Sequence, residues 1–157
     1  MEAKTNSVAT LERMFLFDIK RSLGRMYNRV QEYKEALSHV QAATLYLMDI
    51  RKKFIEELNQ MMQMKLSPYE LKGFKQTLRE LDIDMADTLH TLGTTFQGLK
   101  MNDDAVRCYE LCLESRRQTY GPRGSHLIGE TLNSLGCLLS EMEEGEKVGL
   151  CGLLVDG

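Results

Sequence analysis

The sequence predicts an all-α protein, a solenoid of antiparallel helix pairs. The main evidence is a pattern that occurs twice, in which a Leu-Gly pair is followed by an aromatic residue three positions after the glycine and by Ala at twelve. This spacing is typical of a helix-turn-helix repeat, because small residues let two helices approach and large ones fill the space beside them. A third copy begins at Leu135–Gly136. The two full copies consist of Leu23, Gly24, Tyr27 and Ala36, and of Leu92, Gly93, Phe96 and Ala105.

Residues 1–50 are predicted to form the first helix pair. The first helix is expected from about Val8 to Asn28, with apolar residues every fourth position on one face. That face comprises Leu11, Phe15, Ile19, Leu23 and Tyr27. The second helix follows a turn near Val30–Gln31, and nothing breaks its helical pattern before Ser67–Pro68, so it would be unusually long. Its apolar positions are Ala36, Val40, Ala43, Leu47 and Ile50.

The segment 51–83 separates the first two copies of the pattern. Ser67, Pro68 and Glu70 combine an N-cap serine, a proline at the first helical position and a capping-box glutamate. A helix is therefore expected to begin there and to end near Glu80, and Asp84 would cap the next helix. Two arrangements stay open for 51–83: an inserted or degenerate helical pair, which we favour, and an extended hairpin between the repeats.

The second repeat is assigned to residues 84–121, and residues 126–157 are predicted to be a truncated third repeat with an irregular tail. An acidic turn is expected over 141–146, and a second helix would start at Lys147–Val148. Val148 occupies the position of the repeat's small Ala. The glycines at 149, 152 and 157 oppose a helix by about 1 kcal/mol each.

These residues resemble tetratricopeptide repeats, and more narrowly the long repeats of kinesin light chains and nephrocystin-type proteins. The narrower resemblance rests on Glu114–Gly121, His126 and Thr131–Gly136. It implies a superhelix whose first helices line a concave groove that binds a partner peptide or helix. The peptide-facing positions implied are Arg21, Arg25, Asn28, His90, Thr94, Gln97 and Asn133.

Composition excludes several classes of function. The chain has 157 residues, 43% of them hydrophobic, and a net charge of −3, which disfavours nucleic-acid binding. It has no apolar run long enough to span a membrane and no N-terminal signal core, so we expect an intracellular, cytoplasmic protein. No catalytic or metal-binding constellation is apparent, and no cofactor is expected. Cys108 and Cys112 share one helix face, but we interpret them as buried free thiols rather than metal ligands.

The predicted function is that of a non-enzymatic adaptor or scaffold that binds a protein or peptide. The basic cluster Lys20, Arg21, Arg25 and Arg29 would attract an acidic peptide if it lies in the groove. The resemblance also implies a cytoskeletal, trafficking or ciliary complex. The alternative is a structural module that self-associates, as a homo-oligomer, through the open C-terminal end, where Leu138 and Leu139 would be exposed.

Overall fold

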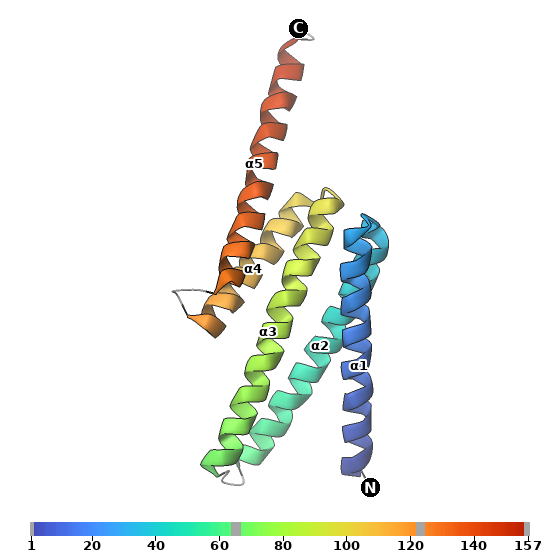
Figure 1. Ribbon diagram of the computed structural model, residues 1–157, viewed down its shortest axis with the longest axis vertical. Helices are drawn as coiled ribbons and strands as arrows, with labels where there is room; N and C mark the ends of the chain where they lie inside the picture. The colour runs from blue at the N-terminus through green and yellow to red at the C-terminus, as the bar shows by residue number, and fades with distance from the viewer. Residues whose placement is uncertain (1, 64–66, 122–124, 156–157) are drawn as a thin grey trace.

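Five helices run alternately up and down in the part of the chain that the computed structural model describes, residues 2–63, 67–121 and 125–155 (Figure 1). Each helix packs on the next one along the chain, and α1 also contacts α3. The described residues contain no strand. The prediction of an all-α solenoid of antiparallel helix pairs is confirmed. The helices are α1 (Glu2–Arg29), α2 (Tyr33–Met62), α3 (Pro68–Gly98), α4 (Asn102–Tyr120) and α5 (His126–Val155).

The turns within the two helix pairs are built alike, which supports the repeat seen in the sequence. Gln31 and Lys100 follow α1 and α3 and both adopt the left-handed conformation, with φ of 63° and 62°. The backbone N–H of the next residue donates to the carbonyl of the repeat's aromatic residue, which closes the helix end. These bonds run from Glu32 to Tyr27 and from Met101 to Phe96, at 3.0 and 2.9 Å.

The first helix pair buries one predicted face and exposes the other. All five predicted apolar positions of α2 are buried, from Ala36 to Ile50. The predicted first helix is present in α1, but its apolar face is not the packed one: Leu11, Phe15 and Ile19 are 53%, 68% and 53% exposed. The buried face of α1 holds Phe17, 4% exposed, and Gly24, which lies against Val40. The exposed residues Leu11, Phe15 and Ile19 form the more regular apolar pattern. On the packed face, Gly24 has no side chain, so α1 can lie close to α2.

Residues 51–62 and 68–83 belong to two long helices, α2 and α3, and not to a separate helical pair, so the described part of 51–83 fits the extended hairpin. Ser67 forms the predicted capping box: its hydroxyl accepts the N–H of Glu70, whose carboxylate accepts the N–H of Ser67. The predicted helix end near Glu80 and the N-cap at Asp84 are wrong. Leu81 is buried in the core cluster of Phe17, Ala43, Leu47 and Ile50, so packing carries α3 through this point.

The second helix pair buries the repeat's small Ala105, as the spacing predicts, but the prediction that Leu138 is exposed is wrong. Ala105 and Tyr109 of α4 are buried with Leu138 of α5, and Phe96 packs against them. A Cβ added at Gly93 would lie 2.8 Å from the ring of Tyr109. The glycine therefore makes room for an aromatic side chain.

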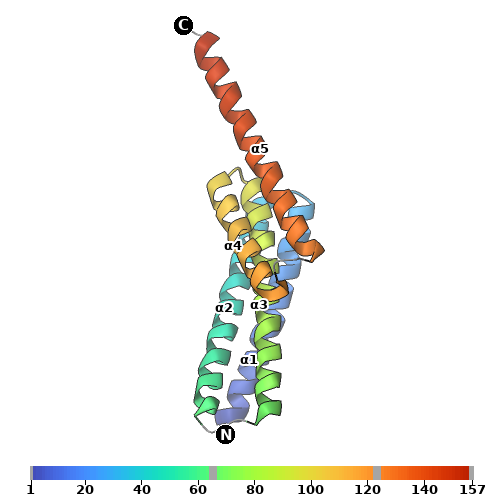
Figure 2. The ribbon, with the colours of Figure 1, turned by 90° about the vertical axis from the view of Figure 1, so that its left-hand side faces the viewer.

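The end of the chain differs from the prediction. The acidic stretch 141–146 forms no turn, and α5 continues as one helix to Val155. Glycine lowers helix stability by only about 1 kcal/mol per residue, and elongation of an existing helix is cooperative, so Gly149 and Gly152 do not stop it, whereas Gly157 lies outside the described residues. Figures 1 and 2 show the last turns of α5 projecting beyond the other helices.

Candidate functional site

A groove of about 380 Å³ lies on the side of the molecule formed by α1, α3 and α5, with the end of α4 at its base. These three are the first helices of the repeats, as predicted for a concave groove. The groove contains four of the seven predicted residues, namely Arg25, Asn28, His90 and Thr94. Its remaining lining residues are Arg29, Asp87, Thr91, Arg116, Leu127 and Glu130.

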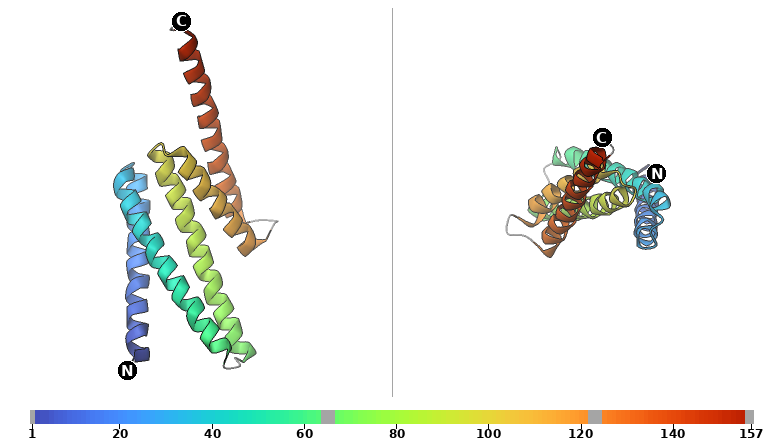
Figure 3. Two further views of the ribbon diagram at one scale, coloured as in Figure 1. Left: turned by 180° about the vertical axis from the view of Figure 1, so that it is seen from behind. Right: turned by 90° about the horizontal axis from the view of Figure 1, so that it is seen from above.

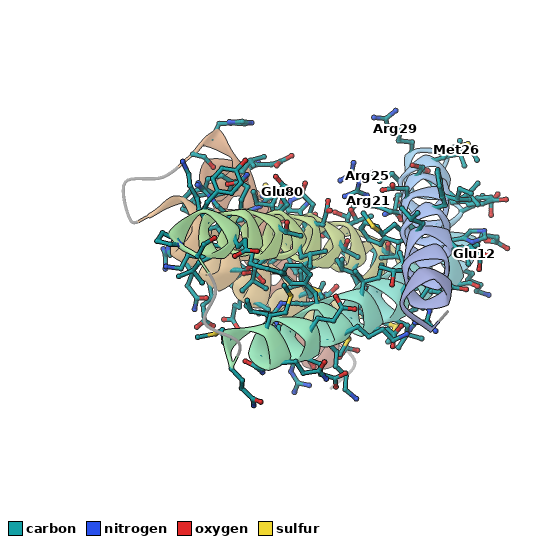
Figure 4. All side chains as sticks on the ribbon, turned by 90° about the horizontal axis from the view of Figure 1, so that it is seen from below. Glu12, Arg21, Arg25, Met26, Arg29 and Glu80 are labelled. Carbon is teal, nitrogen blue, oxygen red and sulfur yellow. The ribbon has the colours of Figure 1, made fainter. Side chains whose placement is uncertain are left out.

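Three arginines spaced four residues apart project from one side of α1 (Figure 4). Arg21 lies outside the groove, where its guanidinium ion-pairs with Asp84 of α3 and stacks 4.7 Å from the Phe17 ring centroid. Arg25 approaches Asp87 at 3.8 Å. Arg29 is exposed and has no ion-pair partner among the described side chains. The charge of Arg29 is therefore the one most available to a partner.

Asn28 fastens α1 to α3 beneath the arginines. Its amide nitrogen donates to the Thr95 hydroxyl at 2.9 Å and to the Thr91 carbonyl at 3.3 Å, while its amide oxygen accepts from Thr95 at 3.0 Å. These bonds use much of the amide's capacity. Asn28 thus lines the groove mainly as a residue that holds its wall in place.

Threonine hydroxyls form the wall of the groove on α3. Thr91 donates to the Asp87 carbonyl at 2.9 Å and Thr94 donates to the His90 carbonyl at 3.1 Å, each one helical turn earlier. Thr91 is only 7% exposed, and the Thr94 oxygen lies 3.3 Å from the Tyr109 hydroxyl, which donates to it. Because the Thr94 proton is already donated, its remaining lone pair can accept only from a donor such as the backbone N–H of an extended peptide.

Arg116 connects three helices at the base of the groove and is only 3% exposed. From α4, its guanidinium donates to Asp87 of α3 at 2.8 Å. It also donates to the Leu127 carbonyl and the Thr131 hydroxyl of α5, both at 2.6 Å. Glu130 lies 3.5 Å away. In the sequence, Arg116 was considered only as part of Glu114–Gly121, the segment on which the narrower resemblance rests, so its role in the groove was not predicted.

The other predicted residues lie outside the groove. Tyr109 donates to Gln97 at 3.1 Å, and Gln97 in turn donates to Glu141 of α5 at 3.3 Å. Asn133 is exposed on α5 beyond Glu130 and has no hydrogen-bond partner among the described side chains. Asn133 is therefore free to contact a partner that extends past the groove.

His90 is the titratable group at the centre of the groove. Its ring lies 5.4 Å from that of Tyr109, and its Nε2 is 3.3 Å from the hydroxyl of Ser134. Burial lowers the pKa of His90 below its ordinary value. The charges around it act in both directions: Glu130 and Asp87 raise its pKa, whereas Arg116 and Arg25 lower it.

We expect folding stability to fall as pH is lowered from about 7.5 to 5.5. In this range the unfolded chain binds a proton at His90, near the ordinary pKa of 6.5, more readily than the folded chain does. Thermal melting over this pH range should show the loss, and His90→Gln should flatten the slope. Equal slopes for the two proteins would contradict the assignment.

A second, larger hollow of about 980 Å³ is bounded by α2, α3 and the end of α4. It exists because α4 has 19 residues whereas α2 and α3 have 30 and 31, so α4 covers only part of the long hairpin. Lys75 lies on its rim without an ion-pair partner among the described side chains. Sequence reasoning missed this site. The unbroken helical pattern of α2 could have indicated it, because so long a helix extends beyond the shorter α4. The apolar lining residues are Met48, Ile55, Leu78 and Met85.

The cysteine pair of α4 belongs to the core. Cys108 and Cys112 are 8% and 0% exposed, and burial raises the pKa of Cys108 to about 11. Cys112 lies 3.7 Å from the Thr131 hydroxyl. Within the described ranges, no three His, Cys, Asp or Glu side chains are grouped to hold a metal ion. The two thiols therefore act as small core residues.

Comparison with known proteins identifies the second helix pair. Residues 85–126 match the family described as tetratricopeptide repeat. The match supports a TPR-type repeat protein. It covers the groove half of α3, all of α4 and the start of α5. Tetratricopeptide repeats generally mediate protein–protein interaction and are typically non-enzymatic scaffolds.

Further comparisons add no relative. Neither the curated proteins nor the solved structures include a significant match to this chain. Among the described helices, none has both the length and the apolar character needed to cross a membrane.

Proposed function

We propose that this protein is a non-enzymatic adaptor that binds an acidic, extended segment of a partner protein in the groove between α1, α3 and α5. The observation that carries this proposal is the exposed, unpaired guanidinium of Arg29 at the edge of the groove. An acidic side chain placed there would gain a charge-assisted hydrogen bond without breaking an existing ion pair.

The polar walls of the groove support the same occupant. Thr94 is half-buried and donates its hydroxyl proton within α3, so its second lone pair, beside the one that accepts from Tyr109, is an acceptor for a backbone N–H of a peptide. Arg25 is 48% exposed in its side chain and shares Asp87 with Arg116, so it adds positive potential beside Arg29. The groove thus offers cationic side chains at one edge and, along α3, a hydroxyl acceptor for a peptide N–H group.

The narrower resemblance to kinesin light chains and nephrocystin-type proteins supports a role as a scaffold in a cytoskeletal, trafficking or ciliary complex in the cytoplasm. This setting stays a prediction. Co-purification of tagged protein from cells, compared between wild type and a groove variant, would name the complex.

Arg29→Glu should weaken capture of acidic peptides by about tenfold, equivalent to about 1.4 kcal/mol. Reversing the charge replaces attraction by repulsion at the edge of the groove. Arg29 forms no ion pair with a described side chain, but it is the basic residue in the last turn of α1, so thermal melting of the variant should check for a loss of about 0.3–1 kcal/mol from the helix dipole. The test is selection of random twelve-residue peptides displayed on phage, followed by fluorescence anisotropy of the selected peptides with both proteins. Added salt should weaken binding to the wild type.

Arg107→Glu is the matched control. Arg107 is an exposed arginine on α4 outside the groove, so the net charge changes equally while binding should not. Arg21→Glu is unsuitable, because Arg21 ion-pairs with Asp84 and its loss would affect packing of α1 on α3. Selection of no acidic sequence, or equal weakening by the Arg29 and Arg107 variants, would contradict the proposal.

A second candidate is capture of an amphipathic helix in the larger hollow beside α2. Its apolar floor and the unpaired Lys75 favour a helix with one apolar face and an acidic edge. The same selection distinguishes the two sites. Peptides held there would have apolar residues at helical spacing, and their binding would depend on Lys75 and not on Arg29.

A further inference from the structure

The groove between α1, α3 and α5 carries opposite charges on its two sides. On the α1 side, the Arg25 side chain is 48% exposed, and Arg29 is exposed without an ion-pair partner among the described side chains. On the α5 side, the groove is lined by Glu130, whose side chain is 54% exposed. Figures 1 and 3 show α3 between α1 and the start of α5. The groove is therefore dipolar: cationic along α1 and anionic along α5.

The charges at the base of the groove cancel each other. Arg116 is 3% exposed and donates to Asp87 at 2.8 Å. Its contact with Glu130 is longer, 3.5 Å from Nη1 to Oε2, so this carboxylate is held only weakly. His90 is neutral near pH 7.4, because burial lowers its pKa below the ordinary value of 6.5. The charge that a partner meets on the α5 side is thus that of Glu130.

A uniformly acidic segment would suit only one side of this groove. An acid beside Arg29 is attracted, but an acid beside Glu130 is repelled, and like charges brought together at an interface lower affinity. A basic side chain beside Glu130 would instead form an ion pair. Its Oε1 accepts no hydrogen bond from a described side chain, so this ion pair would displace no existing partner.

An apolar neighbour on α5 favours a long basic side chain at this place. Leu127 is half-buried, lines the groove and lies three residues before Glu130, so the two are neighbours on the surface of α5. The aliphatic part of a lysine or arginine can lie on Leu127 while its charged end reaches Glu130. The α5 side thus combines an apolar rest with a carboxylate.

We infer that the partner segment is itself dipolar, with an acidic residue that contacts Arg29 and a nearby lysine or arginine that contacts Glu130. This inference rests on the proposed function and specifies its ligand. Packed helices lie about 8–10 Å apart, so α1 and α5, on either side of α3, are about 16–20 Å apart. Long side chains span part of this distance. At about 3.3 Å per residue, the acid and the base should therefore be about two to four residues apart.

Peptide selection on charge variants tests this pairing. Random twelve-residue peptides displayed on phage are selected on the wild type, on Arg29→Gln and on Glu130→Gln. The wild type should enrich peptides that carry both an acid and a base at this spacing. Glu130→Gln should lose the enriched base and keep the acid, and Arg29→Gln should do the opposite. Glu143→Gln is the matched control, because Glu143 is exposed on α5 outside the groove and the net charge changes equally.

A double-mutant cycle then measures the contact at Glu130. The probe is the most enriched wild-type peptide, compared with the same peptide in which the base is replaced by glutamine. This replacement should weaken binding about fivefold for the wild type and for Glu143→Gln, but less than twofold for Glu130→Gln. Fluorescence anisotropy gives the affinities. Circular dichroism checks that Glu130→Gln keeps its helicity, and each comparison of two peptides is made on one protein, so an effect on folding cannot imitate the coupling.

The outcomes separate this inference from the proposed function. Peptides that bind through Arg29 but carry no base at a fixed spacing would overturn the inference and leave the adaptor groove in place. An equal loss for the wild type and Glu130→Gln in the cycle would do the same. Selection of no peptide that depends on Arg29 would contradict both.

Discussion

Replacing Arg116 with methionine should lower the free energy of unfolding by about 3 kcal/mol. The reason is that Asp87 and the polar groups of α5 would lose the buried guanidinium that α4 provides. The side chain is 3% exposed and donates to Asp87, to the Leu127 carbonyl and to Thr131. Methionine fills much of the volume but donates no hydrogen bond. The Thr131 oxygen and Asp87 would then lose their charged donor, and the Leu127 carbonyl would keep only the Thr131 hydroxyl at 2.9 Å. Urea unfolding followed by circular dichroism measures the loss.

The neighbouring Arg117 provides the control. It is exposed on α4, and Arg117→Met should change stability by no more than about 0.5 kcal/mol. Hydrogen exchange gives a second readout, because Arg116 is the polar link between α4 and α5. In Arg116→Met, the amides at the start of α5 should exchange faster than those of α1. A loss below about 1 kcal/mol, or unchanged exchange in α5, would contradict this role.

Sequence reasoning succeeds where local chemistry decides the structure. The capping box at Ser67 and Glu70 needs only residues close in sequence. The spacing from Gly93 to Ala105 and Tyr109 describes a contact between consecutive helices joined by a short turn. Periodicity of α2 also predicts its buried face, from Ala36 to Ile50, because that helix packs between α1 and α3.

Sequence-based predictions fail where contacts with residues distant in sequence determine which face is buried or where a helix ends. The outer stripe of α1 has the stronger periodicity, yet contacts with α2 and α3 turn the face of Phe17 and Gly24 inward. Leu81 carries α3 past the expected end because it packs against residues of α1 and α2. Leu138 was expected at an exposed end, but it is fully buried against Ala105 and Tyr109.

The candidate site is predicted in part for the same reason. The resemblance to tetratricopeptide repeats implies groove positions that include Arg25, Asn28, His90 and Thr94, and these four line the groove. It does not place Arg116, whose position depends on where α4 ends against α5. Nor does it show which arginine of α1 is free, because that depends on the carboxylates of α3: Asp84 and Asp87 lie beside Arg21 and Arg25, whereas Arg29 has no such neighbour.

The three Leu-Gly glycines should respond differently to alanine. Gly24→Ala should destabilise the protein by about 2 kcal/mol, because the new Cβ would collide with Val40, which is 1% exposed and has little room to move. Gly93→Ala should cost less, about 1 kcal/mol, since its Cβ would lie 2.8 Å from the Tyr109 ring. Gly136→Ala should stabilise by about 0.5–1 kcal/mol, because its Cβ meets only open space and alanine favours a helix. Thermal unfolding of the three variants provides the comparison.

A double variant separates the collision at Gly24 from any general effect of alanine. Val40→Ala alone should be destabilising, because it leaves a cavity in the α1–α2 core. Combined with Gly24→Ala, it removes the methyl groups that the new Cβ would meet, so the double variant should lose less than the sum of the two single losses. Strict additivity would show that Val40 does not restrict this position. The expected pattern would mean that the first two glycines serve helix contact, whereas a Cβ at the third, in α5, has no atom of the described residues within 4 Å.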